Sequence, residues 1–110
     1  VKYTTNSFLA MKVSFANEIY EICDGLDIDY DKVIEYAMHD ERLGNSHWMV
    51  PGPDGDFGYG GHCFPKDVQA LIYEACKYKI HPIMLLATHA KNAAVRKNKD
   101  WENQKGRAVI

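Results

Sequence analysis

The first part of the chain carries the feature that most restricts its fold, a long run of apolar residues at helical spacing. The spacing predicts one helix over residues 2–24. Its apolar residues form two adjacent stripes: Phe8, Phe15, Ile19 and Ile22 on one, and Leu9, Val13, Ala16, Tyr20 and Cys23 on the other. A helix that is apolar over more than half its circumference needs partners on two sides. A chain of 110 residues has few helices to supply them, so we expect this helix to build a subunit interface.

Three shorter helices are expected to follow. Gly25 is predicted to cap the first helix, and a second is predicted over Tyr30–Met38 with Asp29 as its N-cap. A third is expected to open at Pro65 and a fourth at Pro82, because proline suits the first turn of a helix. The predicted inner faces hold Val33, Ile34 and Ala37, then Val68, Leu71, Ile72, Ala75 and Cys76, then Leu85, Leu86, His89, Ala90 and Ala93. No segment reads as a strand, so the predicted fold class is all-α.

A long glycine-rich loop is expected between the second and third helices. Residues 44–61 hold six of the chain's eight glycines and two of its four prolines, with no hydrophobic period. A loop of this length in a compact domain is usually functional or disordered. Residues 97–107, KNKDWENQKGR, are polar apart from Trp101. We therefore expect one domain over residues 1–96 and a polar C-terminal tail or linker over residues 97–110.

Cys63 stands where this loop meets the third helix, within GYGGHCFPKD at residues 58–67. The unpaired N–H groups and dipole of a helix N-terminus, and nearby cations such as Lys66, favour the thiolate, which is the nucleophilic form of cysteine. Asp67 follows one helical turn later and could act as a base for a water that attacks a cysteine adduct. The preceding glycines would let the backbone approach a ligand and offer N–H groups to a phosphate or an oxyanion: Gly58, Gly60 and Gly61.

The cysteines have two other interpretations. A lone cysteine is often a small buried apolar side chain, and Cys23 and Cys76 fit that description on apolar helix faces. Cys63 lies among glycines and fits it less well, although the pattern alone leaves both roles open. The spacing of the histidines and cysteines contains no C-x-x-C or H-x-x-x-H, and His62 beside Cys63 is poor chelation geometry, so no metal site is expected. The remaining histidines are interpreted as surface, interface or core residues: His39, His47, His81 and His89.

Charge and cysteine content exclude several classes of protein. A net charge of -2 and a pI near 6.2 give no electrostatic basis for binding nucleic acid or an anionic membrane. No uninterrupted apolar run is long enough to span a bilayer. Three cysteines are an odd number and too sparse for a disulfide framework, so we expect a reducing, cytoplasmic setting.

GYGGHCFPKD resembles the catalytic cysteine motif of the UDP-glucose/GDP-mannose dehydrogenase family. KYTTNSFLAMKVSFANEIYEIC at the start, and DERLG and VPGPDG in the middle, resemble the same family in the same order. The resemblance implies the central helical domain, whose long helix builds a homodimer, and a preceding Rossmann domain that binds NAD. No G-x-G-x-x-G occurs here, so NAD is expected to be bound by a domain absent from this chain, which alone is expected to be inactive.

The resemblance also implies a reaction, a two-step oxidation of a sugar C6 alcohol to the carboxylate. Cys63 would be the nucleophile that holds a thiohemiacetal and then a thioester, and Asp67 would assist hydrolysis of that thioester. Lys2 and Asn6 match the lysine and asparagine of the long helix, and their spacing of four puts both on one helix face. A lysine can stabilise an oxyanion, and an asparagine can fix a water or a substrate hydroxyl.

Further matched residues would bind the substrate. Arg42, in DERLG, matches an arginine that relatives send across the dimer interface to the sugar nucleotide. Gly60 and Gly61 match backbone that lies against the substrate. Tyr59 stands where many relatives have Phe, and its hydroxyl could contact the nucleotide.

The substrate expected from the resemblance is UDP-glucose. FPKD and FLAMKVSFANEIY look most like UDP-glucose 6-dehydrogenases, whereas His62 is similar to relatives that act on N-acetylated UDP-sugars, so another UDP-hexose or GDP-mannose is the alternative substrate. The alternative function is a non-catalytic helical homodimerisation module. Cys63 with Asp67 favours the enzyme, whereas the doubly apolar first helix favours assembly.

Overall fold

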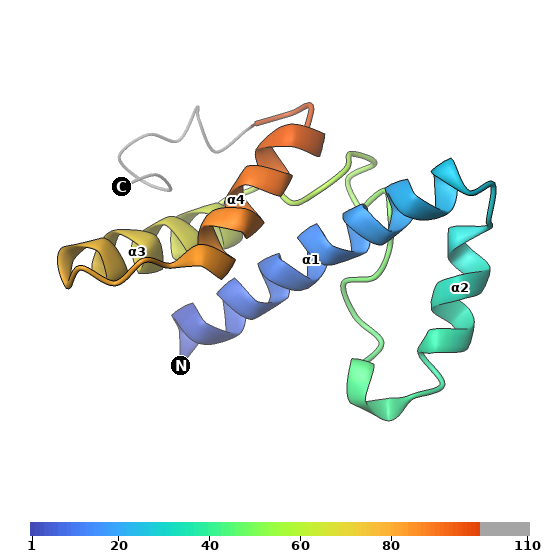
Figure 1. Ribbon diagram of the computed structural model, residues 1–110, viewed down its shortest axis with the longest axis horizontal. Coiled ribbons are helices and arrows are strands. Elements are labelled where there is room, and N and C mark those ends of the chain that lie inside the picture. The colour runs from blue at the N-terminus through green and yellow to red at the C-terminus, as the bar shows by residue number, and fades with distance from the viewer. Residues whose placement is uncertain (100–110) are drawn as a thin grey trace.

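The computed structural model describes residues 1–99. Within them the chain forms helices and no strand, as Figure 1 shows. The elements are α1 (Lys2–Gly25), α2 (Tyr30–Ala37), the short 3-10 helix η1 (Glu41–Leu43), α3 (Cys63–Lys77) and α4 (Ile83–Val95). The all-α prediction is confirmed for this part of the chain. Residues 100–110 of the predicted tail lie outside the described residues.

α1 is the central helix, and the other α-helices contact it. It packs against α3 and α4, and α2 lies near its C-terminal end (Figure 1). Two buried clusters lie along it: Ala10, Tyr59 and Val68 toward the N-terminus, and Ala16, Cys23, Tyr30, Ile34, Trp48 and Val50 toward the C-terminus. Both clusters contain residues of the glycine-rich loop. The loop is therefore part of the core and is positioned by it.

The two apolar stripes of α1 have different surroundings. Ala16 and Cys23 of one stripe are buried within the chain. On the other stripe, Phe8, Phe15 and Ile22 remain 58%, 53% and 51% exposed, although Ile19 packs against the second cluster. These three residues recur every seven positions, so they form one continuous exposed stripe. Residues 1–99 therefore cover one stripe and leave most of the other exposed.

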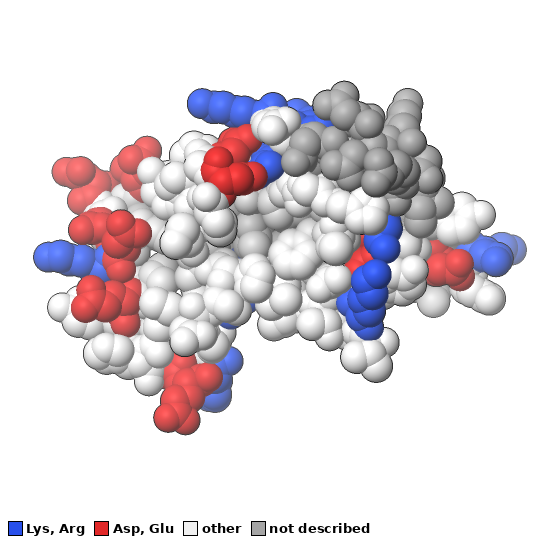
Figure 2. Space-filling view, turned by 180° about the vertical axis from the view of Figure 1, so that it is seen from behind, with Lys and Arg blue, Asp and Glu red and all other residues white. Residues whose placement is uncertain are grey.

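Acidic side chains gather where α1 ends and α2 follows. The end of α1 and the start of α2 carry the exposed acidic residues Asp24, Asp27, Asp29, Asp31 and Glu35. Figure 2 shows acidic side chains concentrated at one end of the face in view, while its middle is largely uncharged. Within residues 1–99, no helix combines the length and the apolar character needed to cross a membrane.

The predicted helix ends are partly right. Asp29 caps α2 as predicted, because its side chain accepts a hydrogen bond from the Asp31 N–H at 3.0 Å. The predicted C-cap at Gly25 is wrong. Gly25 is the last helical residue, and the left-handed conformation falls on Asp27 at φ 58°, where the Ile28 N–H bonds to the Cys23 carbonyl at 2.8 Å. Aspartate tolerates this conformation, so the chain turns two residues later than a glycine cap would require.

The starts and inner faces of α3 and α4 need correction too. α3 begins at Cys63, before Pro65, with His62 as its N-cap. Cys76 and Ala90, both predicted to face inward, are exposed. The buried residues of α4 are Thr88 and Asn92, because α4 meets α1 and the loop through hydrogen bonds: the Ser14 hydroxyl donates to the Thr88 carbonyl at 2.9 Å. Hydrophobic periodicity cannot find a buried face that is polar.

Candidate functional site

The N-terminal ends of α1 and α3 meet at a buried carboxylate. Asp67, in the first turns of α3, is 0% exposed and accepts a hydrogen bond from Asn6 Nδ2 to its Oδ2 at 2.7 Å. Lys66 Nζ lies 3.5 Å from Asp67 Oδ1, and Lys2 lies beside Lys66. The structure therefore brings Lys2 and Asn6 of α1 together with Asp67, which lies 61 positions after Asn6 in the sequence.

The two carboxylate oxygens of Asp67 differ in their surroundings. Its Oδ1 is buried and accepts no hydrogen bond among the described residues, and its neighbouring cation is Lys66. A buried carboxylate oxygen without a hydrogen-bond donor costs free energy, so its presence in a folded protein calls for an explanation such as a catalytic role. Asn6 fixes the other oxygen, so the free one is held in a defined direction. This is the geometry of a group that can orient a water or accept its proton.

Cys63 opens α3 one turn before Asp67 in the sequence, and it is exposed. The helix has 15 residues, so its N-terminal N–H groups and dipole act on the first residue. The next residue, Phe64, packs its ring against Tyr59 at a centroid distance of 6.0 Å and against His47 at 5.6 Å. Cys63 thus combines solvent access with a firmly packed neighbour.

The glycine loop before Cys63 is held by two buried asparagines that sequence reasoning missed. The Tyr59 N–H donates to Asn92 Oδ1 at 2.7 Å, and Asn92 Nδ2 donates to the Tyr59 carbonyl at 2.9 Å. The Gly58 N–H donates to Asn17 Oδ1 at 3.1 Å. A polar residue on an otherwise buried helix face was the available signal: Asn17 follows Ala16, and Asn92 comes one turn after Thr88.

Tyr59 is more enclosed than the sequence suggested. It is 6% exposed, its hydroxyl is buried without a hydrogen-bond partner among residues 1–99, and burial raises the pKa of that hydroxyl. Gly60 and Gly61 follow it in the loop and are half-buried. Contact of the Tyr59 hydroxyl with a nucleotide stays a prediction, one that requires the hydroxyl to be uncovered.

Arg42 lies in η1, apart from this cluster. Its guanidinium is exposed and binds Asp40 through two nitrogens, with Nη2 2.6 Å and Nε 3.0 Å from the carboxylate oxygens, and these bonds lower the pKa of Asp40. Lys12 fixes the neighbouring backbone by donating to the Leu43 carbonyl at 2.7 Å. Within residues 1–99, no hydrogen bond or ion pair links Arg42 to Cys63 or Asp67.

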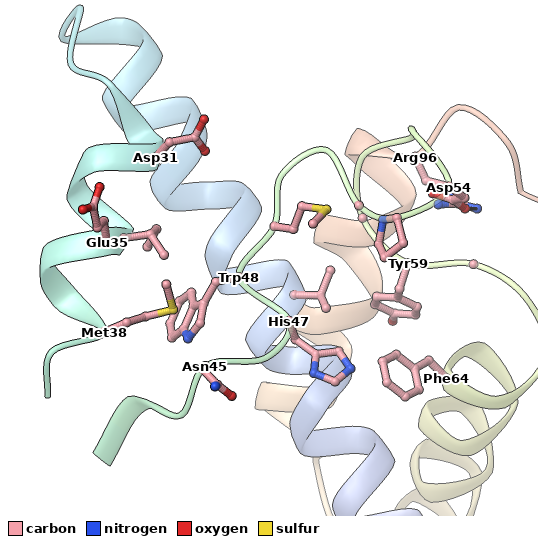
Figure 3. Close-up of a pocket in the computed structure, with 17 residues that line it drawn as sticks. Asp31, Glu35, Met38, Asn45, His47, Trp48, Asp54, Tyr59, Phe64 and Arg96 are labelled. Atoms are coloured by element: carbon pink, nitrogen blue, oxygen red, sulfur yellow. Dashed lines mark hydrogen bonds and ion pairs between the residues drawn. The ribbon is translucent and has the colours of Figure 1, made fainter. Parts of the chain in front are cut away.

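A cavity of about 800 Å³ opens beside the glycine loop. Its walls include Ile34 of α2, Met38 just after that helix, Trp48 and Tyr59 of the loop, and Phe64 of α3. Figure 3 shows Met38, Trp48, Tyr59 and Phe64 around the pocket. Small-molecule sites have this size and this mixture of apolar walls with a few polar groups. Tyr59 and Gly60 line it, so two of the residues expected to bind substrate border the cavity.

A buried arginine anchors the outer part of the loop. Arg96, whose side chain is 1% exposed, donates from Nη2 to Asp54 Oδ2 at 2.7 Å. This hydrogen bond lowers the pKa of Asp54, and the N–H of Asn98, 2.7 Å from Asp56, is the main cause of the lowered pKa of Asp56. In residues 1–99, no three His, Cys, Asp or Glu side chains gather as a metal would need.

Comparison with known proteins identifies relatives of the whole region. The central domain of the UDP-glucose/GDP-mannose dehydrogenase family matches residues 1–94. The UDP-glucose 6-dehydrogenase of Pseudomonas aeruginosa is 41% identical over 92 residues, which cover 84% of this chain and 19% of the relative. The GDP-mannose 6-dehydrogenase of the same organism is 41% identical over 86 residues, 76% of this chain and 19% of the relative. The UDP-glucose 6-dehydrogenase of Rhizobium meliloti is 38% identical over 110 residues, 100% of this chain and 23% of the relative. The chain spans about a fifth of the length of these relatives.

The two exposed thiols differ in their place on α3, and this predicts an order of reactivity. Cys63 is at the N-terminal, positive end of the helix, and Cys76 is in the last turn, at the negative end. The dipole contributes 0.3–1 kcal/mol at each end, so a combined difference of about 1 kcal/mol gives Cys63 an advantage of about fivefold. Cys23 is buried and should react at least about tenfold more slowly than either. Limiting iodoacetamide followed by peptide mass spectrometry measures the three rates. Faster labelling of Cys76 than of Cys63 would show that helix position does not activate Cys63.

Proposed function

The chain belongs to the UDP-glucose/GDP-mannose dehydrogenase family, and from this membership we propose that it is the central domain of an NAD-dependent nucleotide-sugar 6-dehydrogenase. The observation that carries the proposal is the pairing of an exposed thiol at a helix N-terminus with a buried carboxylate one turn later. NAD would be bound by a domain outside this chain, since no dinucleotide fingerprint occurs in the sequence. The domain alone would not be active.

In the proposed reaction, Cys63 carries the substrate between two oxidations. NAD, when bound, accepts one hydride from the sugar C6 in each step. The first oxidation converts the alcohol to an aldehyde, and the Cys63 thiolate adds to its carbonyl carbon to give a thiohemiacetal. The second removes the remaining hydride from that carbon and leaves a thioester on the sulfur. Water then attacks the thioester carbon, and the C–S bond breaks to release the carboxylate and the thiol.

The cluster around Asp67 suits the hydrolytic step. Asp67 Oδ1, which lies beside the Lys66 ammonium and accepts no hydrogen bond within residues 1–99, would take a proton from the attacking water, while the Asn6 amide holds Oδ2 at 2.7 Å. Lys2 would stabilise negative charge on the oxygen of the tetrahedral adduct. Gly60 and Gly61 would lie against the substrate with their backbone, because glycine leaves room for close approach.

We propose UDP-glucose as the substrate, on the likeness of FPKD and the α1 sequence to UDP-glucose enzymes. Overall sequence identity does not distinguish between the two substrates, because a UDP-glucose 6-dehydrogenase and a GDP-mannose 6-dehydrogenase are both 41% identical to this chain. The cavity beside Tyr59 and Phe64 would receive the nucleotide, whose flat base suits aromatic and aliphatic walls. A cytoplasmic location is proposed with it, since all three cysteines lie within residues 1–99 and none is in a disulfide there.

We further propose a homodimer built on α1. The exposed stripe of Phe8, Phe15 and Ile22 needs a cover that residues 1–99 of the same chain do not supply. A dimer would also give Arg42 its role, because its exposed guanidinium could leave Asp40 and reach the sugar nucleotide of the partner subunit. A dimerisation module without chemistry is the second candidate, favoured by the same stripe, but it assigns no task to the Asn6–Asp67 pair.

Phe15→Glu in the full-length protein tests the dimer. A carboxylate in the middle of the stripe should dissociate the dimer at micromolar concentration, since an unpaired charge in an apolar interface is costly. Tyr36→Glu is the matched control, because Tyr36 is a 70% exposed aromatic on α2, away from the stripe. Sedimentation velocity reads out both variants. A wild-type protein that sediments as a folded monomer would refute the dimer.

Activity of the full-length protein tests the enzyme. Wild-type protein should reduce two NAD for each UDP-glucose consumed, with GDP-mannose oxidised at least about tenfold less efficiently. Cys63→Ser should abolish formation of the acid, and Arg42→Ala should raise the KM for the sugar nucleotide without changing that for NAD. Cys76→Ser is the control thiol variant and should stay active. Failure of the wild type to oxidise either nucleotide sugar would favour the dimerisation module.

A further inference from the structure

The backbone of Tyr59 is paired as if it lay in a sheet, but its partner is a side chain. The Asn92 amide accepts from the Tyr59 N–H at 2.7 Å and donates to the Tyr59 carbonyl at 2.9 Å. Asn92 is 1% exposed, so both bonds are shielded from water. Buried backbone groups must find partners, and a loop has no ladder to provide them. One amide from α4 satisfies both groups of the residue that precedes Gly60.

A second asparagine holds the adjoining residue from a different helix. Asn17 of α1, 2% exposed, accepts from the Gly58 N–H at 3.1 Å, and its own Nδ2 is fixed on the Val13 carbonyl at 2.8 Å. Gly58 has φ 71°, and a Cβ there would come within 2.1 Å of Asn92 Oδ1. Only glycine allows the loop to approach Asn92 this closely.

The segment held in this way leads directly to the nucleophile. Gly60, Gly61 and His62 are the residues between Tyr59 and Cys63. The Tyr59 ring also contacts the ring of Phe64, the residue after Cys63, at 6.0 Å. The position of Tyr59 therefore constrains the first turn of α3 in two ways, through the short connecting backbone and through the contact of the Tyr59 and Phe64 rings.

We propose that Asn92 and Asn17 are positioning residues, which fix Gly58 and Tyr59 and thereby set where Gly60, Gly61 and Cys63 meet the substrate. This inference rests on the proposed function, which supplies the substrate. The asparagines touch no reacting atom and act through the backbone of the loop. A displacement of the reacting groups by about 1 Å can cost about a hundredfold in rate, so a clamp of this kind has a large effect.

Asn92 bonds α4 to the loop, whereas a separate hydrogen bond joins α4 to α1. The Ser14 hydroxyl donates to the Thr88 carbonyl at 2.9 Å and links the same two helices one turn away. Ser14 is buried and does not bond to the loop. Ser14→Ala therefore removes a buried hydrogen bond between α1 and α4 and leaves the clamp intact. It separates general destabilisation from displacement of the loop.

The experiment compares Asn92→Leu, Asn92→Asp and Ser14→Ala in the full-length protein. Leucine has a similar shape and makes neither bond, whereas the aspartate retains an acceptor for the Tyr59 N–H. We expect Asn92→Leu to lower kcat at least about tenfold, Asn92→Asp to lower it less, and Ser14→Ala to stay within about twofold of wild type. The KM for NAD should not change, because NAD would be bound elsewhere. Amide exchange across residues 58–62 should accelerate in Asn92→Leu and not in Ser14→Ala.

Each result decides a separate question. Equal kcat and equal amide exchange in Asn92→Leu and Ser14→Ala would overturn the positioning role. If Asn92→Leu does not fold, the graded effect of Asn92→Asp against Ser14→Ala decides in the same way. If the wild type oxidises no nucleotide sugar, the proposed function fails. The rate of Cys63 alkylation then decides the inference: it should change at least about threefold in Asn92→Asp and stay constant in Ser14→Ala.

Discussion

The pairing of the Asn92 amide with the backbone of Tyr59 is the contact on which the arrangement of the loop depends. It joins α4 to the residue that begins the path to Cys63, and Asn17 adds α1 to the same point. These bonds form only if α1 and α4 lie at a fixed distance and register. The Ser14–Thr88 bond joins the same two helices one turn away, and the fully buried Ala10 and Ala16 let neighbours come close to α1.

This design places polar groups where most domains place apolar ones. Asn17, Asn92 and Asp67 are all almost fully buried, and each is bonded to the site region. A buried polar group that loses its partner costs about 1–3 kcal/mol, a sizeable share of the stability of a small domain. Moving the loop to another position would therefore break these hydrogen bonds and cost free energy. Stability and the geometry of the site are coupled through the same hydrogen bonds.

Much of the fold could be predicted from the sequence, because α1, α2 and the loop follow strong local signals. Apolar spacing predicted α1, Asp29 predicted the start of α2, and the glycines predicted the long loop. The family motifs singled out Asn6 and Asp67, which the structure brings within 2.7 Å. Periodicity failed at α4, where the buried face carries Thr88 and Asn92 rather than the predicted apolar residues.

The residues that hold the loop could not have been found by the same rules. Asn17, Asn92 and Arg96 form contacts across 33 to 42 positions of sequence, and nothing in their neighbours indicates a distant backbone partner. The predicted cap at Gly25 was wrong because of a local hydrogen bond. The Ile28 N–H bonds to the Cys23 carbonyl, and the turn falls on Asp27. Cys76 was expected inside because its helix face was read as wholly apolar, yet it lies at the exposed end of α3. Local patterns locate helices, whereas long-range hydrogen bonds select which of their faces are used.

The proposed role of Cys63 as a covalent carrier of the substrate is tested most directly by trapping the adduct. Full-length Asp67→Ala protein, given UDP-glucose and NAD and then quenched in acid, should hold the sugar nucleotide on the Cys63 peptide, because attack by water on the thioester is slowed. Peptide mass spectrometry should find this adduct on Cys63, and none when Cys63 is also replaced by serine. An adduct on Cys76, or continued oxidation of UDP-glucose to the acid by the Cys63→Ser protein, would contradict the account.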